Sequence, residues 1–351
     1  LGHNGILPLM RVFYELFGYY KHDLEFPFGA GNQFIVSKKA ILQHPREFYS
    51  KIVHMLNYEN CPIEGYVIER FQYLIFAFSH SLFRNERTIA MSYFLHQCSL
   101  RYHTNNVVMI PYNTSDRGVS HPPSLEYTMC YNKNYPELAA FCIPDCFFHN
   151  WFSANIHSFE ETKLQLIEAS RHLPTKHKVG WVGNIHSPLP DVIEYSTRPL
   201  LKSLGDTHSQ LFDIIHVSPN ETGIIGENSP GYLSLVDLVK TYSFLIDIGG
   251  NGWSGRLKFL LFSKRPLLLV DRVYIEYFYS DLQPYVHYIP VKSDLSDLID
   301  QTKWIYDHPE KAEEIANHAF DFAMENFVLD KFLRRVYHVY NHIVTLTKKK
   351  N

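Results

Sequence analysis

The chain has 351 residues, enough for two or three domains, with 46% hydrophobic and 15% aromatic residues, as in a globular protein. A formal net charge of -3 argues against a nucleic-acid binder, and no apolar run is long enough to span a bilayer. The five cysteines have no regular spacing, which favours reduced thiols over a disulfide framework. No paired cysteine or histidine motif with metal-ligand spacing is present.

Residues 1–100 are predicted to form a mainly helical N-terminal module. Helices are expected over Ile6–Tyr20, from Pro45 onward and over Tyr66–Phe78. The segments Gly31–Ser37 and His44–Tyr49, with the pair Glu69-Arg70, resemble the C-terminal part of an uncharacterised domain of fungal and viral proteins. The module is therefore expected to be the tail of a larger domain.

Residues 101–175 carry a short apolar strand, Val107–Ile110, that leads toward Asp116. An aromatic segment follows at Phe141–Trp151 and contains Asp145. The period of Phe159–Leu173 predicts an amphipathic helix.

The rest of the chain reads as alternating strands and helices, which is typical of a parallel sheet. Strands are expected at Lys178–Ile185, Phe212–Val217, Tyr242–Ile248 and Leu267–Val270, and helices at Ser296–Tyr306, Pro309–Phe327 and Phe332–Leu346. The division predicted here is a Rossmann-like segment over 176–330, followed by a C-terminal helix and basic tail over 331–351.

The glycine turn Gly249–Gly252 follows one of these strands and precedes a helix-like run, Trp253–Phe262. Glycines allow backbone N–H groups to approach a ligand, and a helix N-terminus favours an anion. Arg256 and Lys258 follow the turn, and Arg256 could bind a diphosphate with two N–H groups. The alternative is an ordinary β-α turn with solvated cations.

The same turn also fits a dinucleotide fingerprint, Gly250-x-Gly252-x-x-Gly255, with Asp271 at the end of the next strand for a ribose. That fingerprint usually opens its fold, whereas here it lies deep in the chain. A dinucleotide site also has little need of cations at Arg256 and Lys258. An NAD-dependent oxidoreductase is therefore the alternative interpretation.

The run Tyr274–Leu298, with its core His287–Ser296, resembles the C-terminal signature of the CAP10-like glycosyltransferases, glycosyltransferase family 90. That family includes protein O-glucosyltransferases of the endoplasmic reticulum and fungal capsule xylosyltransferases. The resemblance implies an α/β, GT-B-like fold with two Rossmann-like halves. The first half, 101–175, would face the acceptor, and the second half, 176–330, would bind the donor. It also implies a UDP-sugar donor, inversion at the anomeric carbon and no metal or other cofactor.

In the related enzymes, a short strand leads to an aspartate that acts as the catalytic base, and Asp116 has a comparable place. The reaction needs one carboxylate within hydrogen-bond reach of the acceptor hydroxyl. Asp145 is the second candidate. Without this resemblance, Asp116 would be an ordinary turn aspartate before Gly118.

The resemblance also assigns a donor site, although the family's arginine soon after Ser187 is missing, and Arg198 is the expected substitute. Trp253 departs from the small residues common before the loop arginine. Asp271 would either bind the ribose or cap the next helix, on which Glu276 is expected to contact the ribose. The expected donor-binding residues are Asn184, Ser187, Arg198, Asn251, Gly252, Trp253, Ser254, Gly255, Arg256 and Glu276.

The sequence thus predicts an enzyme that transfers a sugar, glucose or xylose, from a UDP-sugar to a hydroxyl of a protein or glycan. Besides the oxidoreductase, a non-catalytic protein that binds sugar nucleotides or glycans stays open. The cytoplasm and the lumen of the endoplasmic reticulum are both compatible with the sequence, and the sugar, the acceptor and the oligomeric state are left open.

Overall fold

The computed structural model describes residues 11–13, 16, 46–57, 68, 82–102, 110, 112–113, 115–118, 125–151, 154, 156–186, 193–218, 229–250 and 252–350.

The chain forms two compact units, Leu1–Asn85 and Glu86–Asn351. In the first unit, helix α3 (Arg46–Leu56) begins directly after Pro45, as expected. Within the predicted helix Ile6–Tyr20, the described residues are helical, and three lie buried with the spacing of one apolar face: Val12, Phe13 and Leu16. Glu69, Arg70 and Gly31–Ser37 lie outside the described residues.

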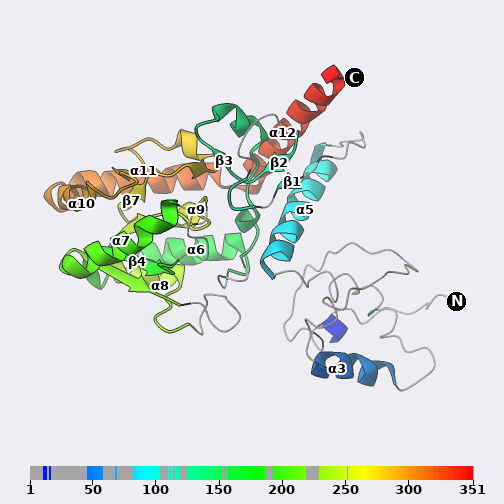
Figure 1. The fold of residues 1–351 in the computed structure, drawn as a ribbon, viewed down its shortest axis with the longest axis horizontal. Coiled ribbons are helices and arrows are strands. Elements are labelled where there is room, and N and C mark those ends of the chain that lie inside the picture. Colours follow the sequence, from blue (N-terminus) through cyan, green and yellow to red (C-terminus); the bar gives the residue numbers. More distant parts are fainter. Residues whose placement is uncertain are drawn as a thin grey trace. The chain divides into compact units, whose positions relative to one another are not determined.

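A five-stranded parallel sheet is the centre of the second unit (Figure 1). Its strands are β4 (Lys176–Gly183), β5 (Phe212–His216), β6 (Tyr242–Asp247), β7 (Leu267–Val270) and β9 (Ile289–Val291), paired in the order β5-β4-β6-β7-β9. The first four strands are those that the apolar runs predict. The fifth strand, inside the signature His287–Ser296, was not predicted. If these strands are numbered 1 to 5 along the chain, their order across the sheet is 2-1-3-4-5. The direction in which successive strands are added therefore reverses between β4 and β6. Open parallel sheets bind ligands at the carboxyl ends of the strands at such a reversal.

The side chains of the strands alternate between two hydrophobic cores, one on each face of the sheet. On β6, Phe244 and Ile246 enter one core, and Tyr242 and Leu245 enter the other. The first core also includes residues of α7 (Ile193–Thr207), α10 (Leu298–Asp307) and the start of α11 (Pro309–Asn326). The second includes residues of α6 (Phe159–Ser170), α8 (Leu235–Thr241) and α9 (Leu257–Leu260). Burial on both faces explains why these strands read as continuous apolar runs.

The segment before the sheet contains short elements among its described residues. They are the parallel pair β1 (Tyr112–Asn113) and β2 (Tyr127–Thr128), strand β3 (Tyr131–Asn132), which pairs with β8 (Tyr274–Ile275), and the 3₁₀ helices η1 (Pro136–Phe141) and η2 (Cys146–Phe148). Of the predicted strand Val107–Ile110, only Ile110 is described. The α/β class is confirmed, and the second half, 176–330, is Rossmann-like. In the first half, the described residues form two-residue strands and no larger sheet.

Helix α5 (Leu82–Tyr102) was not predicted, and it changes the expected division of the chain. Its buried residues Met91, Phe94 and Cys98 belong to the core of the second unit. The observed units therefore divide between Asn85 and Glu86, whereas the sequence suggested residue 100. The expected segments 101–175, 176–330 and 331–351 all lie within the second unit.

The last helix, α12 (Leu329–Lys350), crosses back to the first half (Figure 1). Phe332 packs against Phe148, with ring centroids 4.4 Å apart, and against Phe94 of α5 at 6.2 Å. Arg335 donates hydrogen bonds to the carbonyls of Cys142 at 2.9 Å and Ala139 at 2.5 Å. The two ends of the second unit thus share one core.

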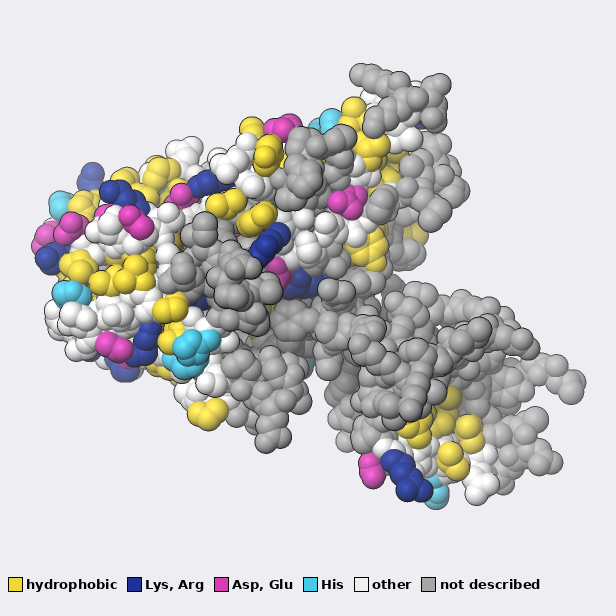
Figure 2. All heavy atoms as spheres, in the orientation of Figure 1, with side chains coloured by type: hydrophobic (Ala, Val, Ile, Leu, Met, Phe, Trp, Pro, Cys, Tyr) yellow, Lys and Arg dark blue, Asp and Glu magenta, His cyan; other side chains and the backbone are white. Residues whose placement is uncertain are grey.

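Three further expectations concern surface and chemistry. Cys98, Cys130, Cys142 and Cys146 are free and buried, which confirms reduced thiols for the four described cysteines. Within the described ranges, no helix is long and apolar enough to cross a membrane. Figure 2 shows acidic and basic side chains interspersed over the described part of the face in view, in agreement with the nearly balanced charge.

Candidate active site

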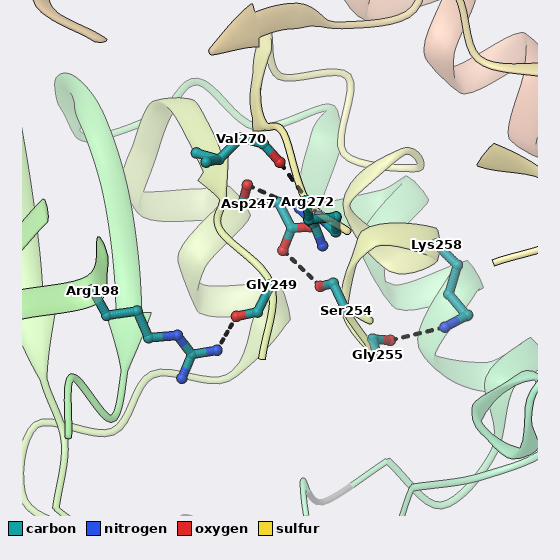
Figure 3. A network of polar contacts seen from close by, with 8 residues as sticks. All are labelled: Arg198, Asp247, Gly249, Ser254, Gly255, Lys258, Val270 and Arg272. Atoms are coloured by element: carbon teal, nitrogen blue, oxygen red, sulfur yellow. Dashed lines mark hydrogen bonds and ion pairs between the residues drawn. The ribbon is translucent and has the colours of Figure 1, made fainter. Parts of the chain in front are cut away.

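The carboxyl ends of β4 and β6 bring two loops together at the reversal of strand order. Asn184 follows β4 directly, and the glycine turn follows β6. Arg198, on α7, reaches both loops: its Nη1 donates to the Asn184 carbonyl at 3.0 Å, and its Nη2 donates to the Gly249 carbonyl (Figure 3). Its guanidinium also lies 5.5 Å from the centroid of the Trp181 ring. The sequence predicts that Arg198 takes the place of the arginine that the family has soon after Ser187. The position of Arg198 between the two loops is compatible with that prediction.

The guanidinium of Arg256 also lies near Trp181, at 5.7 Å from the ring centroid. Its Nη1 donates to the carbonyl of Val182 at 2.8 Å. Burial lowers the pKa of Arg256, although the charges of Asp247 and Tyr232 oppose this effect. Among the described residues, no carboxylate forms an ion pair with Arg256. A bound anion would therefore stabilise the charged form of this half-buried guanidinium.

A buried network fixes the shape of the loop after β6 (Figure 3). The Asp247 carboxylate accepts from Ser254 Oγ at 2.7 Å and from Arg272 Nη2 at 2.8 Å. Arg272 also donates to the carbonyls of Asp247 at 3.1 Å and Val270 at 3.3 Å. Burial opposes the charge of Arg272, but Asp247 raises its pKa overall. Neither Asp247 nor Arg272 is among the residues that the sequence predicts for the site. An aspartate inside an apolar strand was the available signal, because a buried carboxylate needs a partner.

The helix after the glycine turn is shorter than expected. The run Trp253–Phe262 predicted a helix of about ten residues, whereas α9 spans only Leu257–Leu260. A single turn carries little helix dipole, so the argument for an anion at its N-terminus is wrong. The charged groups that could bind an anion here are the guanidinium groups of Arg256 and Arg198.

Lys258 does not face a ligand or solvent. Its Nζ lies 2.6 Å from Asp145 Oδ2 and 2.9 Å from Glu276 Oε1, and all three side chains are buried. The same Nζ donates to the Gly255 carbonyl at 3.2 Å (Figure 3). Burial raises the pKa of Glu276 well above its usual range, and Asp145 adds to this, although Lys258 opposes it. We refer to Asp145, Lys258 and Glu276 as the buried triad.

The buried triad determines the place of two predicted site residues. Asp145 also accepts from the Phe147 N–H at 2.7 Å, where it caps η2. Glu276 follows strand β8. The sequence suggested a helix here, and the structure shows none at Glu276. Asp145 is 1% exposed and Glu276 2%, so both carboxylates join the two halves inside the protein.

Asp116 lies in a turn after β1, directly against the glycine loop. Its carbonyl accepts from the Trp253 N–H at 3.3 Å and from Cys130 Sγ at 3.4 Å. A Cβ added to Gly252 would lie 1.8 Å from that carbonyl oxygen. The Asp116 side chain is 32% exposed and pairs with Arg87 of α5, with Arg87 Nη2 2.6 Å from Asp116 Oδ1. The candidate base and the candidate donor loop are therefore neighbours.

Other predicted residues lie near this contact or outside the described chain. Asp271 pairs with Lys133 at 2.5 Å and is followed by β8, so its expected role as a helix cap is wrong. Trp151 stacks on Phe147 at 4.1 Å, close to Gly255, whereas Phe148 is part of the core. Ser187 and Asn251 lie outside the described residues.

The predicted residues that the fold gathers around the loop are Asp116, Asn184, Arg198, Gly252, Trp253, Ser254, Gly255 and Arg256. In the described ranges, no cluster of three or more His, Cys, Asp or Glu residues could hold a metal ion.

The second unit is thus an α/β fold with a Rossmann-like parallel sheet, arginines at its switch point and an aspartate against the glycine loop. Residues 111–350 match the model of glycosyl transferase family 90, and the chain belongs to that family. This membership agrees with the GT-B-like class that the sequence suggested.

Two relatives and one solved structure show the range of similarity. Protein O-glucosyltransferase 2 of Danio rerio is 39% identical over 99 residues, 28% of this chain and 20% of that protein. Protein O-glucosyltransferase 1 of Rattus norvegicus is 32% identical over 137 residues, 39% of this chain and 30% of that protein. The matches thus span less than a third of these relatives. The structure of Anabaena Alr3699/HepE in complex with UDP shares 10% identity over 51% of this chain and 44% of that one, with a TM-score of 0.32. A similarity at that level adds nothing to the assignment.

Proposed function

We propose that this protein transfers a sugar from a UDP-sugar to a hydroxyl group of a protein or glycan acceptor. The contact between Asp116 and the glycine loop carries this proposal. It places a partly exposed carboxylate beside the loop where a sugar diphosphate would bind. Family membership supports sugar transfer, and the names of the relatives favour glucose, with xylose as the second candidate.

The two arginines would hold the diphosphate. Arg256 has no carboxylate partner among the described residues, and Arg198 joins the two loops at the switch point. Negative charge grows on the departing diphosphate as its bond to the sugar breaks, and fixed guanidinium groups stabilise such charge. We propose that they take the place of a metal ion in this step.

Asp116 would act as the base. The acceptor oxygen forms a bond to the anomeric carbon, and its proton moves to the Asp116 carboxylate. The bond between that carbon and the diphosphate oxygen breaks, and its electron pair leaves with UDP. Attack from the face opposite the leaving group inverts the configuration. Asp145 is unsuited to this role because its carboxylate lies in the buried triad.

The structure also bears on the NAD-dependent alternative. A dinucleotide fingerprint needs its third glycine for close packing of a helix on a strand, and its acidic residue for the ribose. Here a Cβ at Gly255 would meet Phe147 and Trp151 of the first half, and Asp271 pairs with Lys133. Both observations favour the transferase.

Ligand-dependent thermal unfolding tests the proposal, with a panel of UDP-sugars, UDP and NAD in the presence of EDTA. We expect one UDP-sugar to stabilise the protein by about 2.7 kcal/mol at a hundredfold excess over its Kd. Arg256→Ala should remove most of this increment. Arg265→Ala is the matched control. Arg265 binds the carbonyls of Val239, Ser170 and His172 away from the loop, so its loss should destabilise the free protein but keep the increment.

Turnover separates an enzyme from a non-catalytic binding protein. The stabilising UDP-sugar should release UDP in the presence of an acceptor, and Asp116→Asn should bind the donor but lose turnover. Stabilisation by NAD alone would contradict the proposal. Tight UDP-sugar binding with no turnover on any acceptor would support the binding protein instead.

A further inference from the structure

Helix α5 lies before the segment that matches the family, yet it supplies an arginine to the candidate base. The Arg87 side chain is 10% exposed, and its Nη2 lies 2.6 Å from Asp116 Oδ1. The family match begins at residue 111, so neither α5 nor Arg87 belongs to the matched segment. From the sequence alone, Arg87 falls in the N-terminal module predicted over residues 1–100.

The surroundings of Arg87 keep it charged. Its guanidinium lies 5.8 Å from the centroid of the Phe147 ring, and Asp145 and Cys146 of the first half are close by. Burial opposes the charged form, but Asp116, Cys146 and Asp145 together raise the pKa of Arg87. A buried ion pair is weak evidence for stability, because removing two charges from water costs about as much as their attraction returns. The pair therefore calls for another explanation.

We propose that Arg87 is a positioning residue, which holds the Asp116 carboxylate in a fixed orientation beside the glycine loop. This inference depends on the proposed role of Asp116 as the base. Asp116 has two anchors: its backbone carbonyl accepts from Trp253 of the donor loop, and its carboxylate pairs with Arg87 of α5. Helix α5 thus completes an active site whose other residues lie in the family segment.

Among the described residues, the other ionisable groups around the pair are Asp145, which caps η2, Cys146 on η2, Cys130, which contacts the Asp116 carbonyl, and the exposed neighbour Arg117. Burial raises the pKa of Cys130 well above its usual range, so its thiol stays neutral. Arg87 is the cation that the structure pairs with the Asp116 carboxylate.

The experiment compares Arg87→Gln and Arg87→Lys with Arg101→Gln, on the full chain. Arg101 is on the same helix, but its pair with Asp330 is exposed, so it is a matched control. For Arg87→Gln we expect kcat to fall by about a hundredfold, with KM for the UDP-sugar unchanged within about twofold. Arg87→Lys keeps a cation at this place and should restore part of the lost kcat. Arg101→Gln should match the wild type.

A double-mutant cycle in urea unfolding gives a readout that does not depend on activity. If Arg87 binds Asp116, the midpoint shift of the pair Arg87→Gln and Asp116→Asn should be smaller than the sum of the single shifts. Additive shifts would overturn the inference, as would an Arg87→Gln variant that folds and keeps the wild-type kcat. If the wild type turns over no donor but the shifts are non-additive, the proposed function fails and the pair itself stands. The two failures are thus distinguishable.

Discussion

The α carbon of Gly252 lies so close to the carbonyl of Asp116 that a Cβ on it would be 1.8 Å from that oxygen. Both partners are backbone atoms, so neither can move away as a flexible side chain would. The backbone of Gly252 is not in the left-handed region, so the requirement for glycine here is one of space. The donor loop can lie against the candidate base only while this position has no side chain.

Gly252→Ala should therefore separate the two segments. We expect a loss of about 1–3 kcal/mol of stability from overpacking, and about a hundredfold lower turnover from a displacement on the order of 1 Å. Urea unfolding and steady-state kinetics measure both effects.

Gly231→Ala is the control for this substitution. Gly231 has a φ of +78°, and a Cβ there would meet Ile215 at an ordinary 3.4 Å. Gly231→Ala should lower the free energy of unfolding by about 1–2 kcal/mol through backbone strain and leave kcat unchanged. Equal kinetic effects of the two alanines would contradict the role of the Gly252 contact.

Lys258→Met should be among the most destabilising single substitutions. It leaves Asp145 buried beside Glu276 with no cation, and breaking a buried pair on one side costs about 3–5 kcal/mol. Chemical denaturation of the free protein measures this loss.

Glu276→Gln is the matched variant within the buried triad. Burial raises the pKa of Glu276, so the folded protein favours its neutral form, which a glutamine amide imitates. The expected loss is about 1 kcal/mol or less. A loss as large as that of Lys258→Met would show that the carboxylate of Glu276 is charged in the folded protein.

Arg198→Lys should weaken donor binding. One ammonium cannot bind the carbonyls of Asn184 and Gly249 with the geometry of the guanidinium fork, so the two loops lose their common anchor. We expect Kd for UDP to rise about tenfold, which corresponds to 1.4 kcal/mol. Calorimetric titration measures Kd. The exposed Arg171, paired with Glu168, serves as the control, and Arg171→Lys should bind UDP as the wild type does.

The pair between Asp213 and Lys176 predicts a pH-dependent contribution to stability. Burial acts to raise the pKa of Asp213, but hydrogen bonds from Lys176 and Tyr242 lower it overall. A lowered pKa in the folded state gives stability that is present above the ordinary value of 3.8 and is lost as the pH falls through the folded value.

Asp213→Asn should therefore be less stable than the wild type at pH 7, by about 1 kcal/mol or less, and equally stable at the acid end. Thermal unfolding of both proteins between pH 7 and the acid end measures this difference in stability. Asp206→Asn removes an exposed pair with Lys202 and should give no such pH trend. A difference between Asp213→Asn and the wild type that does not change with pH would contradict the electrostatic explanation.

The sequence predicted the sheet well because parallel strands buried on both faces leave an unambiguous apolar signal. The runs at Tyr242–Ile248 and Leu267–Val270 became β6 and β7 with little change in their bounds. The glycine turn and Arg256 were also found, because backbone freedom and cation chemistry are local properties. These predictions needed no knowledge of distant contacts.

Predictions failed where a side chain's role depends on tertiary contacts. Lys258 looks like a solvated cation in sequence, but its partners Asp145 and Glu276 come from other segments. Arg87 and Asp116 are joined only after α5 packs onto the core, and α5 itself has a weak apolar period. The short α9 was overestimated because an apolar run does not show where a helix ends. The roles proposed for Asp116, Arg198 and Arg256 stay predictions.

The return of α12 to the first half has a consequence for how the chain folds during synthesis. Arg335 binds the carbonyl of Cys142 across 193 positions of sequence, and Phe332 covers Phe148. Contacts so far apart form late, because a long loop must close first. The aromatic segment around Phe148 therefore leaves the ribosome early, and its core is complete only when the last helix arrives. In this protein the first half is translated before the parallel sheet and completes its core after it, and incompletely covered apolar surface favours aggregation during that interval.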